Sequence, residues 1–130
     1  MTNILVIDDC DVFRELLGMV LEDSGHKYIE ANGLDEALEA LDKEDIGLVF
    51  CDLMMPTDFE EDYAEDSAMV GVSTIKEINK KYPELPIVAI SGKMSHVPLQ
   101  GLKTFGASAG ITKPFEQESL LRLIDDLATA

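Results

Sequence analysis

Five side chains of chemically useful types stand at or just after the ends of four apolar runs in this sequence. They are Asp8 and Asp9, Asp52, Ser91 and Lys113. Each alone has a structural explanation, because acids, serines and lysines at such places often cap helices, form turns or face solvent. Their shared location is informative, because parallel strands end at one edge of a sheet, where open α/β sheets bind ligands. The pattern therefore predicts a site at that edge.

The chemistry that suits this set involves phosphate. Three carboxylates at one edge repel one another, so either one of them is protonated or a cation binds. The side-chain ligands are oxygens, and Mg²⁺ fits best because it accepts one or two carboxylates, keeps several waters and also holds phosphate oxygens. Lys113 offers a point charge for an anion, and Ser91 offers a hydroxyl donor. The set predicts phosphoryl transfer to an aspartate.

Five short runs predict the strands that position these groups. The central run is Leu48-Val49-Phe50-Cys51, which leads into Asp52 and is followed by Leu53-Met54-Met55-Pro56. An apolar run of this length that ends at a breaker fits a strand buried on both faces. The other predicted strands are residues 3–7, 27–31, 87–91 and 109–112.

Helical periodicity occupies the intervals between these strands. Asp11 and Asn32 are expected to cap the first two helices, and Gly25 is expected to end the first. The other helices are expected at 70–82, within 97–105, and at 116–128. The expected buried stripes are Phe13, Leu16, Leu17 and Val20; Leu34, Ala37, Leu38 and Leu41; Ile75 and Ile78; and Leu120, Leu121, Ile124 and Leu127. The alternation predicts one α/β domain, a doubly wound (βα)5 three-layer sandwich around a parallel five-stranded sheet.

At these residues the chain resembles the receiver domain of two-component response regulators. The matching motifs are Ile7-Asp8-Asp9, Asp52-Leu53-Met54-Met55-Pro56, Ser91-Gly92 and Lys113-Pro114-Phe115. The spacing also matches, with 44 residues from Asp8 to Asp52 and 22 from Ser91 to Lys113. The resemblance covers nearly the whole chain. It implies a flavodoxin-like fold with strand order 2-1-3-4-5 and a single receiver domain over residues 1–130.

The resemblance also implies roles for individual residues and partners. Asp52 would be the phosphoacceptor, charged by a histidine kinase or a histidine phosphotransfer protein. The domain would be a signalling module rather than an enzyme, and its downstream protein target is not indicated. The implied Mg²⁺ ligands are Asp9, Asp52 and the Met54 carbonyl, with Asp8 acting through water, and the implied ligands of the phosphoryl oxygens are Ser91 and Lys113.

Three features depart from the family pattern. Gly110 occupies a position, three residues before the lysine, where the family often has the Tyr or Phe that reports phosphorylation. The expected fourth helix contains Pro98 and Gly101, which both disfavour helix. An acidic insert at about 57–68 separates the phosphoacceptor motif from Met69-Val70-Gly71, a segment that the family usually has soon after the proline.

Other functions remain open at the level of sequence. A flavodoxin-type nucleotide binder would share the fold, but it needs a Ser/Thr/Gly-rich phosphate loop where this chain has Asp8-Asp9-Cys10-Asp11. An Asp-nucleophile phosphatase of the haloacid dehalogenase type usually carries a second acid two residues after the nucleophile, where this chain has Met54. A receiver fold that signals without phosphate is a third alternative.

Composition excludes some partners. The chain has 26 acidic and 10 basic residues and a net charge of −16, which argues against nucleic acid or an anionic membrane as a direct partner. No apolar run approaches the roughly 18 residues of a membrane span, and no basic segment typical of a signal peptide is present. A cytoplasmic location is therefore expected. Cys10 and Cys51 are too few for a disulfide framework and are expected to be small buried residues.

The acidic insert is a candidate for partner selection. It holds six acids between Asp58 and Asp66 and no base, and it is expected to be a mobile loop with at most a short helical turn. Because it follows the strand that bears Asp52, its charges would favour a donor with a basic docking patch and repel acidic ones.

We expect that replacing residues 57–68 with a short turn slows phosphotransfer from the cognate kinase. Exposed charges are screened within about 10 Å at 0.1 M salt, so the slowing should shrink as salt is raised. Acetyl phosphate has no docking surface and serves as the control donor, with an unchanged rate. Kinase transfer at the native rate in low salt would show that the insert does not select the donor.

Overall fold

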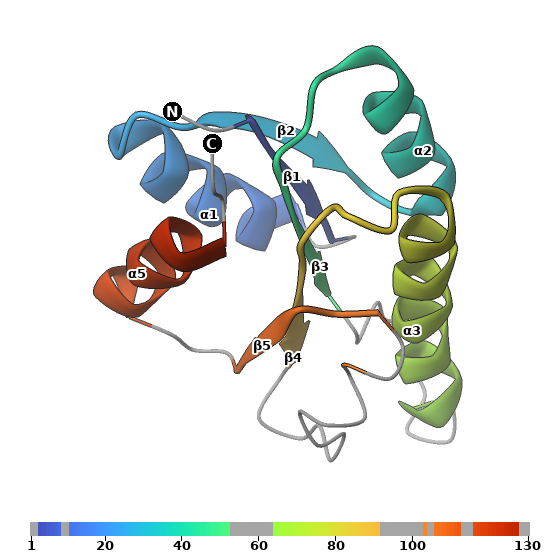
Figure 1. The fold of residues 1–130 in the computed structure, drawn as a ribbon. Helices are drawn as coiled ribbons and strands as arrows, with labels where there is room; N and C mark the ends of the chain where they lie inside the picture. The colour runs from blue at the N-terminus through green and yellow to red at the C-terminus, as the bar shows by residue number, and fades with distance from the viewer. Residues whose placement is uncertain are drawn as a thin grey trace.

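The structure, a computed structural model, is built from alternating strands and helices (Figure 1). It describes residues 3–8, 11–52, 64–91, 103, 106–112 and 116–127. The strands are β1 (Asn3–Ile7), β2 (Lys27–Ala31), β3 (Leu48–Asp52), β4 (Ile87–Ser91) and β5 (Ala109–Thr112). The helices are α1 (Asp11–Asp23), α2 (Leu34–Lys43), α3 (Ala64–Lys81) and α5 (Gln117–Leu127). All five predicted strands are thereby confirmed.

The strands form a single parallel sheet in the order β2-β1-β3-β4-β5. Helices α1 and α5 cover one face of the sheet, and α2 and α3 cover the other (Figure 1). The doubly wound, flavodoxin-like prediction is confirmed. Strand β1 connects forward to β2 on one side and is flanked by β3 on the other, so the order reverses between β1 and β3. Open α/β sheets bind ligands beside such a reversal, at the carboxyl ends of the strands.

Two hydrophobic cores follow from the alternation of side chains along the strands. On β1, Ile4 and Val6 pack towards α1 and α5. Leu5 and Ile7 pack towards α2 and α3. Because both faces of the sheet are covered, β1, β3 and β4 are apolar at nearly every position rather than at every second one, whereas the edge strand β2 carries the exposed Lys27 and Glu30. The helical residues buried in these cores include Leu17, Leu21, Leu120 and Ile124 on one side and Ala37, Leu41, Ile75 and Ile78 on the other.

Helix α1 turns Phe13, Leu17 and Val20 towards the core as predicted, but not Leu16. Leu16 was expected inside but is 58% exposed, whereas Leu21 is fully buried. The reason is a close approach between Gly18 and the ring of Tyr28 on β2, since a Cβ on Gly18 would lie 2.5 Å from Tyr28 Cε2. The buried positions of the helix are 14, 17, 18 and 21, a stripe that includes this glycine. Phe13 is only partly buried against the same core.

The helix ends also differ in part from the predictions. Asp11 is the first residue of α1 rather than a residue before it. The N-cap of α2 is Gly33 and not Asn32, whose backbone N–H donates instead to Glu36 Oε1 at 2.8 Å. A glutamate one turn into the helix can bind such an N–H, which leaves the Asn32 side chain unused as a cap. Gly25 has φ 90 and ends α1 as predicted.

Helix α3 begins earlier than predicted. It starts at Ala64 rather than near residue 70, so the carboxyl-terminal part of the acidic insert is helical and not a loop. Residues 57–63 lie outside the described residues, as does the predicted helix at 97–105 apart from Lys103, which is helical. A deletion that tests the insert's loop alone should therefore stop before Ala64.

We predict that Leu21→Ala destabilises the fold far more than Leu16→Ala. The Leu21 side chain is fully buried, so its truncation leaves a cavity, and the free energy of unfolding should fall by about 2–5 kcal/mol. Leu16 lies on the same helix but is exposed, and its truncation should change that free energy by less than about 0.5 kcal/mol. Chemical denaturation of both variants measures the difference. Equal losses would contradict the observed orientation of α1.

Candidate functional site

Two of the predicted site acids lie side by side at the carboxyl edge of the sheet. Strands β1 and β3 pair in parallel as far as Ile7 with Cys51, so Asp8 and Asp52 occupy the next register position. The backbone N–H of Asp8 still donates to the Ala31 carbonyl of β2, at 3.1 Å. Asp8 is fully buried and Asp52 is 3% exposed. Two buried acids at neighbouring strand ends are costly unless cations or donors compensate them.

The register also places the other strand ends at this edge. Asp52 pairs with Ile90 of β4, so Ser91 is one residue further on. Ser91 in turn pairs with Thr112, the last residue of β5. The sheet therefore aligns the ends of four strands, as predicted. Three predicted site residues, Asp9, Met54 and Lys113, lie outside the described residues; Asp9 directly follows Asp8 in the chain, and Lys113 directly follows Thr112.

The negative charges of the two acids also act on a buried thiol, that of Cys51. Cys51 is fully buried and belongs to the α2–α3 core. Burial raises the pKa of the Cys51 thiol, and the negative charges of Asp52 and Asp8 raise it further. The thiol therefore stays protonated at neutral pH. This agrees with the expectation of a small buried residue; Cys10 lies outside the described residues.

Arg14 is a residue of this edge that the sequence reasoning missed. It lies on α1, its side chain is 10% exposed, and Nη1 donates to the backbone carbonyl of Asp8. Nη2 donates to Asp11 Oδ1, and Nε lies 3.3 Å from Glu30 Oε1. The available signal was a basic residue at an inward helical position, three residues after an acid. Removing its donor from the buried Asp8 carbonyl should cost about 1–3 kcal/mol of stability.

The groups at this edge suit a hard cation. The two described acids offer carboxylate oxygens, and Mg²⁺ favours such ligands together with retained waters. Within the described part of the chain, no group of three or more His, Cys, Asp or Glu side chains is arranged to hold a metal ion. The expected ligands Asp9 and Met54 lie outside the described residues, so their contribution stays a prediction.

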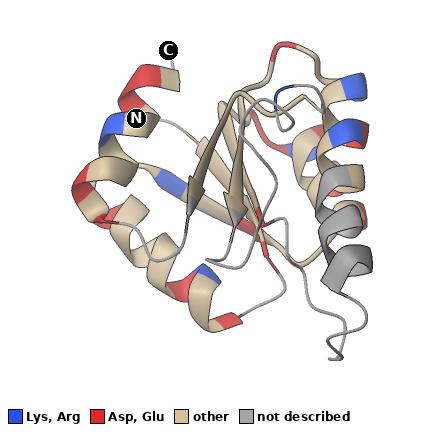
Figure 2. Ribbon diagram, turned by 90° about the horizontal axis from the view of Figure 1, so that it is seen from below, with Lys and Arg blue, Asp and Glu red and all other residues tan. Residues whose placement is uncertain are grey.

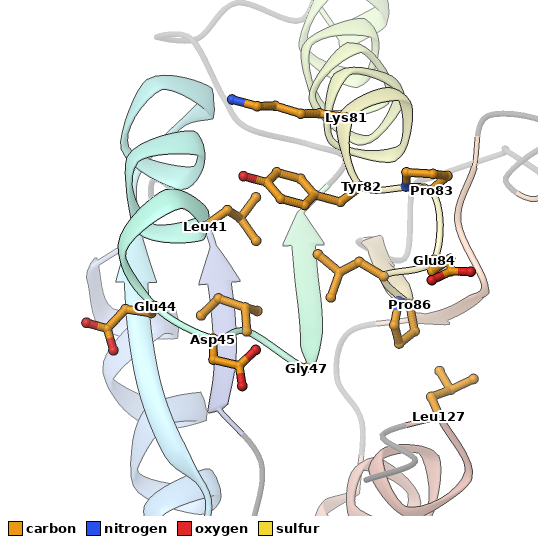
Figure 3. A pocket seen from close by; sticks show the side chains of 12 residues that line it. Leu41, Glu44, Asp45, Gly47, Lys81, Tyr82, Pro83, Glu84, Pro86 and Leu127 are labelled. Atoms are coloured by element: carbon orange, nitrogen blue, oxygen red, sulfur yellow. The ribbon is translucent and has the colours of Figure 1, made fainter.

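A separate pocket lies at the opposite end of the strands (Figure 3). It has a volume of about 610 Å³, and Gly47 and Pro86, which precede β3 and β4, form part of its wall. Its side chains are mostly apolar, with Tyr82 donating to Asp42 Oδ1 at 2.7 Å nearby. The pocket shares no residue with the acidic edge, so it is not the predicted site.

The charged residues are spread over the helices on both faces of the sheet (Figure 2).

We predict that Cys51 resists alkylation in the folded protein. In a Cys10→Ser background, iodoacetamide at pH 8 should leave Cys51 unmodified for hours, because its raised pKa and its burial both suppress the reactive thiolate. Unfolding in guanidinium should restore rapid alkylation. Mass spectrometry measures the modified fraction. Alkylation of the folded protein at the rate of the unfolded one would show that the thiol is accessible.

Comparison with known proteins agrees with this architecture. The family model of the response regulator receiver domain matches residues 4–125. Among curated relatives, the sensory/regulatory protein RpfC of Xanthomonas campestris is 29% identical over 98% of this chain, and the transcriptional regulatory protein GlrR of Escherichia coli is 27% identical over 95%. The chain spans only 17% and 26% of the lengths of these two proteins.

Solved structures show the same fold along the whole length of isolated receiver domains. The receiver domain of NtrX from Brucella abortus is 31% identical, with a TM-score of 0.82 and coverage of 97% of this chain and 98% of that one. The chemotaxis protein CheY4 of Vibrio cholerae is 26% identical, with a TM-score of 0.81 and coverage of 98% of both chains. No helix in the described part of this chain is long and apolar enough to cross a membrane. With its matching family model, sheet order and paired acids, the chain belongs to the receiver domain family of two-component response regulators.

Proposed function

We propose that Asp52 is the residue of this receiver domain that accepts the phosphoryl group. The observation that carries this proposal is the position of Asp52. It is the last residue of β3, it is nearly buried, and it lies at the register position next to Asp8. Its partner on β4 is Ile90, the residue before Ser91. The backbone of Asp52 is held in the sheet by pairing with Ile90 of β4, directly after the last β1–β3 pair at Cys51. Such rigidity suits an in-line attack, because the reacting atoms must be held in one geometry.

The proposed donor is a phosphohistidine of a histidine kinase or a histidine phosphotransfer protein. An Asp52 oxygen attacks the phosphorus, an O–P bond forms, the P–N bond breaks, and the electron pair of that bond stays on the imidazole nitrogen. Bound Mg²⁺ would neutralise the charge of the phosphoryl oxygens in this transfer. Asp9, Asp52 and the Met54 carbonyl would hold the ion, with Asp8 acting through water.

We propose that Ser91 and Lys113 bind the phosphoryl oxygens once Asp52 is modified. The pairing of β4 with β5 supports this proposal, since Ser91 and Thr112 are register partners and Lys113 is the next residue in the sequence. The response cannot use an aromatic side chain at position 110, because β5 has Gly110 there, paired with Ala89. The signal is therefore expected to travel through Ser91, Lys113 and the backbone that follows them. The domain supplies an acceptor site and assists only its own phosphorylation and dephosphorylation.

The receiver family assignment favours this function over a flavodoxin-type binder and an Asp-nucleophile phosphatase, and phosphorylation of Asp52 would separate it from a receiver fold that signals without phosphate. A flavodoxin-type binder would need to place an anionic phosphate directly beside the buried Asp8 carboxylate. A phosphatase of the Asp-nucleophile type would hydrolyse small phosphate esters with turnover, whereas a receiver is modified once and keeps its phosphoryl group for a time. An absorbance spectrum and an assay with p-nitrophenyl phosphate separate these functions.

We predict that acetyl phosphate with Mg²⁺ adds a single phosphoryl group to the wild-type protein and none to Asp52→Asn. The amide has the size of the carboxylate but has no nucleophilic carboxylate oxygen. Intact-mass spectrometry measures the addition. Asp42→Asn is the matched control, since Asp42 is an exposed acid on α2 near the other edge of the sheet, and it should be modified like wild type. A phosphoryl group retained in Asp52→Asn would refute the assignment.

A further inference from the structure

One arginine joins three elements at the edge that carries Asp52 and Asp8. The guanidinium of Arg14, on α1, donates to the Asp8 carbonyl at the end of β1 and to the Asp11 carboxylate at the start of α1. Its Nε lies 3.3 Å from Glu30 Oε1, on β2. Asp8 and Asp11 flank the two residues of the β1–α1 connection, Asp9 and Cys10. Arg14 therefore fixes the chain on both sides of Asp9.

The backbone of Asp8 is held from two directions. Its N–H donates to Ala31 of β2, and its carbonyl accepts from Arg14. The two ion pairs of Arg14 involve exposed carboxylates, since Asp11 is 83% exposed and Glu30 is 53% exposed. Exposed pairs contribute little, whereas a buried carbonyl depends on its donor. The contact with Asp8 is therefore the important one, and Asp11 and Glu30 orient the guanidinium that makes it.

The surroundings of Arg14 keep its side chain in one position. One turn further along α1, the ring of Tyr28 packs against Gly18, where a larger residue would collide with it. The Tyr28 hydroxyl is buried near Glu30 and Arg14, and its pKa is raised by burial first and by the charge of Glu30 second. An arginine has a planar fork that can reach several acceptors at once, which the single ammonium of a lysine cannot do.

We propose that Arg14 is a positioning residue for the metal site, because it binds the Asp8 carbonyl and the Asp11 carboxylate and thereby holds the end of β1, with Asp8, next to Asp52. This inference rests on the proposed function, which places Mg²⁺ at that edge. A positioning role and a purely electrostatic role of Arg14 predict opposite changes in Mg²⁺ affinity when the residue is replaced. A cation near a metal site weakens Mg²⁺ binding by repulsion, so an Arg14 that acted only by charge would lower the affinity, and its removal would raise it.

Two substitutions separate geometry from charge. Arg14→Lys keeps the charge and loses the fork, and Arg14→Met loses both. We expect both variants to bind Mg²⁺ about tenfold more weakly than wild type, the usual scale for losing a group that orients a metal ligand. Isothermal titration calorimetry on the full chain without phosphodonor measures the affinity. Amide hydrogen exchange in the metal-free protein should also accelerate at Asp8 more than at buried strand residues such as Val49.

Controls distinguish this effect from a general loss of stability. Ile78→Val removes one methylene from a fully buried side chain on the other face of the sheet, and should leave Mg²⁺ affinity unchanged. Thermal unfolding in EDTA reports the stability of each variant. Asp11→Ala removes one partner of the guanidinium at an exposed position without touching the core, and it should accelerate amide exchange at Asp8 in the metal-free protein even if the Arg14 variants do not fold.

The outcomes are distinct. Wild-type Mg²⁺ affinity in Arg14→Lys, or tighter binding in Arg14→Met, would overturn the positioning role while leaving the proposed metal site intact. Native amide exchange at Asp8 in Asp11→Ala would count against it in the same way. If the wild-type protein bound no Mg²⁺ at millimolar concentrations, both the proposed metal site and the role of Arg14 would be refuted.

Discussion

The parallel pairing of β1 with β3 is the constraint on which the rest of this structure depends. It brings Asp8 and Asp52 to adjacent positions at one edge, and both are almost fully buried. Buried like charges at this separation raise the free energy of the folded state unless cations or hydrogen-bond donors compensate them. A site of this kind is poised to bind a cation, and an anion such as a phosphoryl group can then approach it. The two acids therefore define the edge at which the proposed function is placed.

The remainder of the fold supplies the stability and rigidity that such an edge requires. The strands behind the two acids are buried on both faces, and α1 with α5 and α2 with α3 enclose them in two separate cores. Apolar burial in these two cores stabilises the folded state and offsets the free-energy cost of burying the two acids. The receiver domains to which this chain is similar share only about a quarter to a third of its residues, yet superimpose closely. The alternation of apolar residues that builds both cores is sufficient to preserve the sheet order.

Arg14 shows how charge and geometry act together beside that edge. Burial opposes the charged form of its guanidinium, but the carboxylates of Asp11 and Glu30 outweigh this effect and raise its pKa. The residue therefore remains a cation within the fold, in contact with a backbone carbonyl rather than with a site carboxylate. Its position depends on the packing of Gly18 against Tyr28, which brings α1 close to β2. A contact between two residues with no role in the chemistry thus helps to place one that bears on it.

The sequence by itself determined the elements that local periodicity specifies. Apolar runs located most of the strands, with a weaker pattern at residues 27–31. The spacing of acids and polar residues at the strand ends located the candidate site, and the motifs around Asp52 and Lys113 indicated the family. Tertiary structure decided what depends on contacts between distant residues. The face of α1 that is buried depends on Gly18 meeting Tyr28, so the sequence favoured Leu16 where the fold buries Leu21. The capping of α2 by Gly33, the start of α3 at Ala64 and the contact of Arg14 with Asp8 were likewise outside its reach. Helical periodicity fixes the spacing of a stripe but not its rotation, and only packing against the sheet selects one of the two apolar stripes on α1.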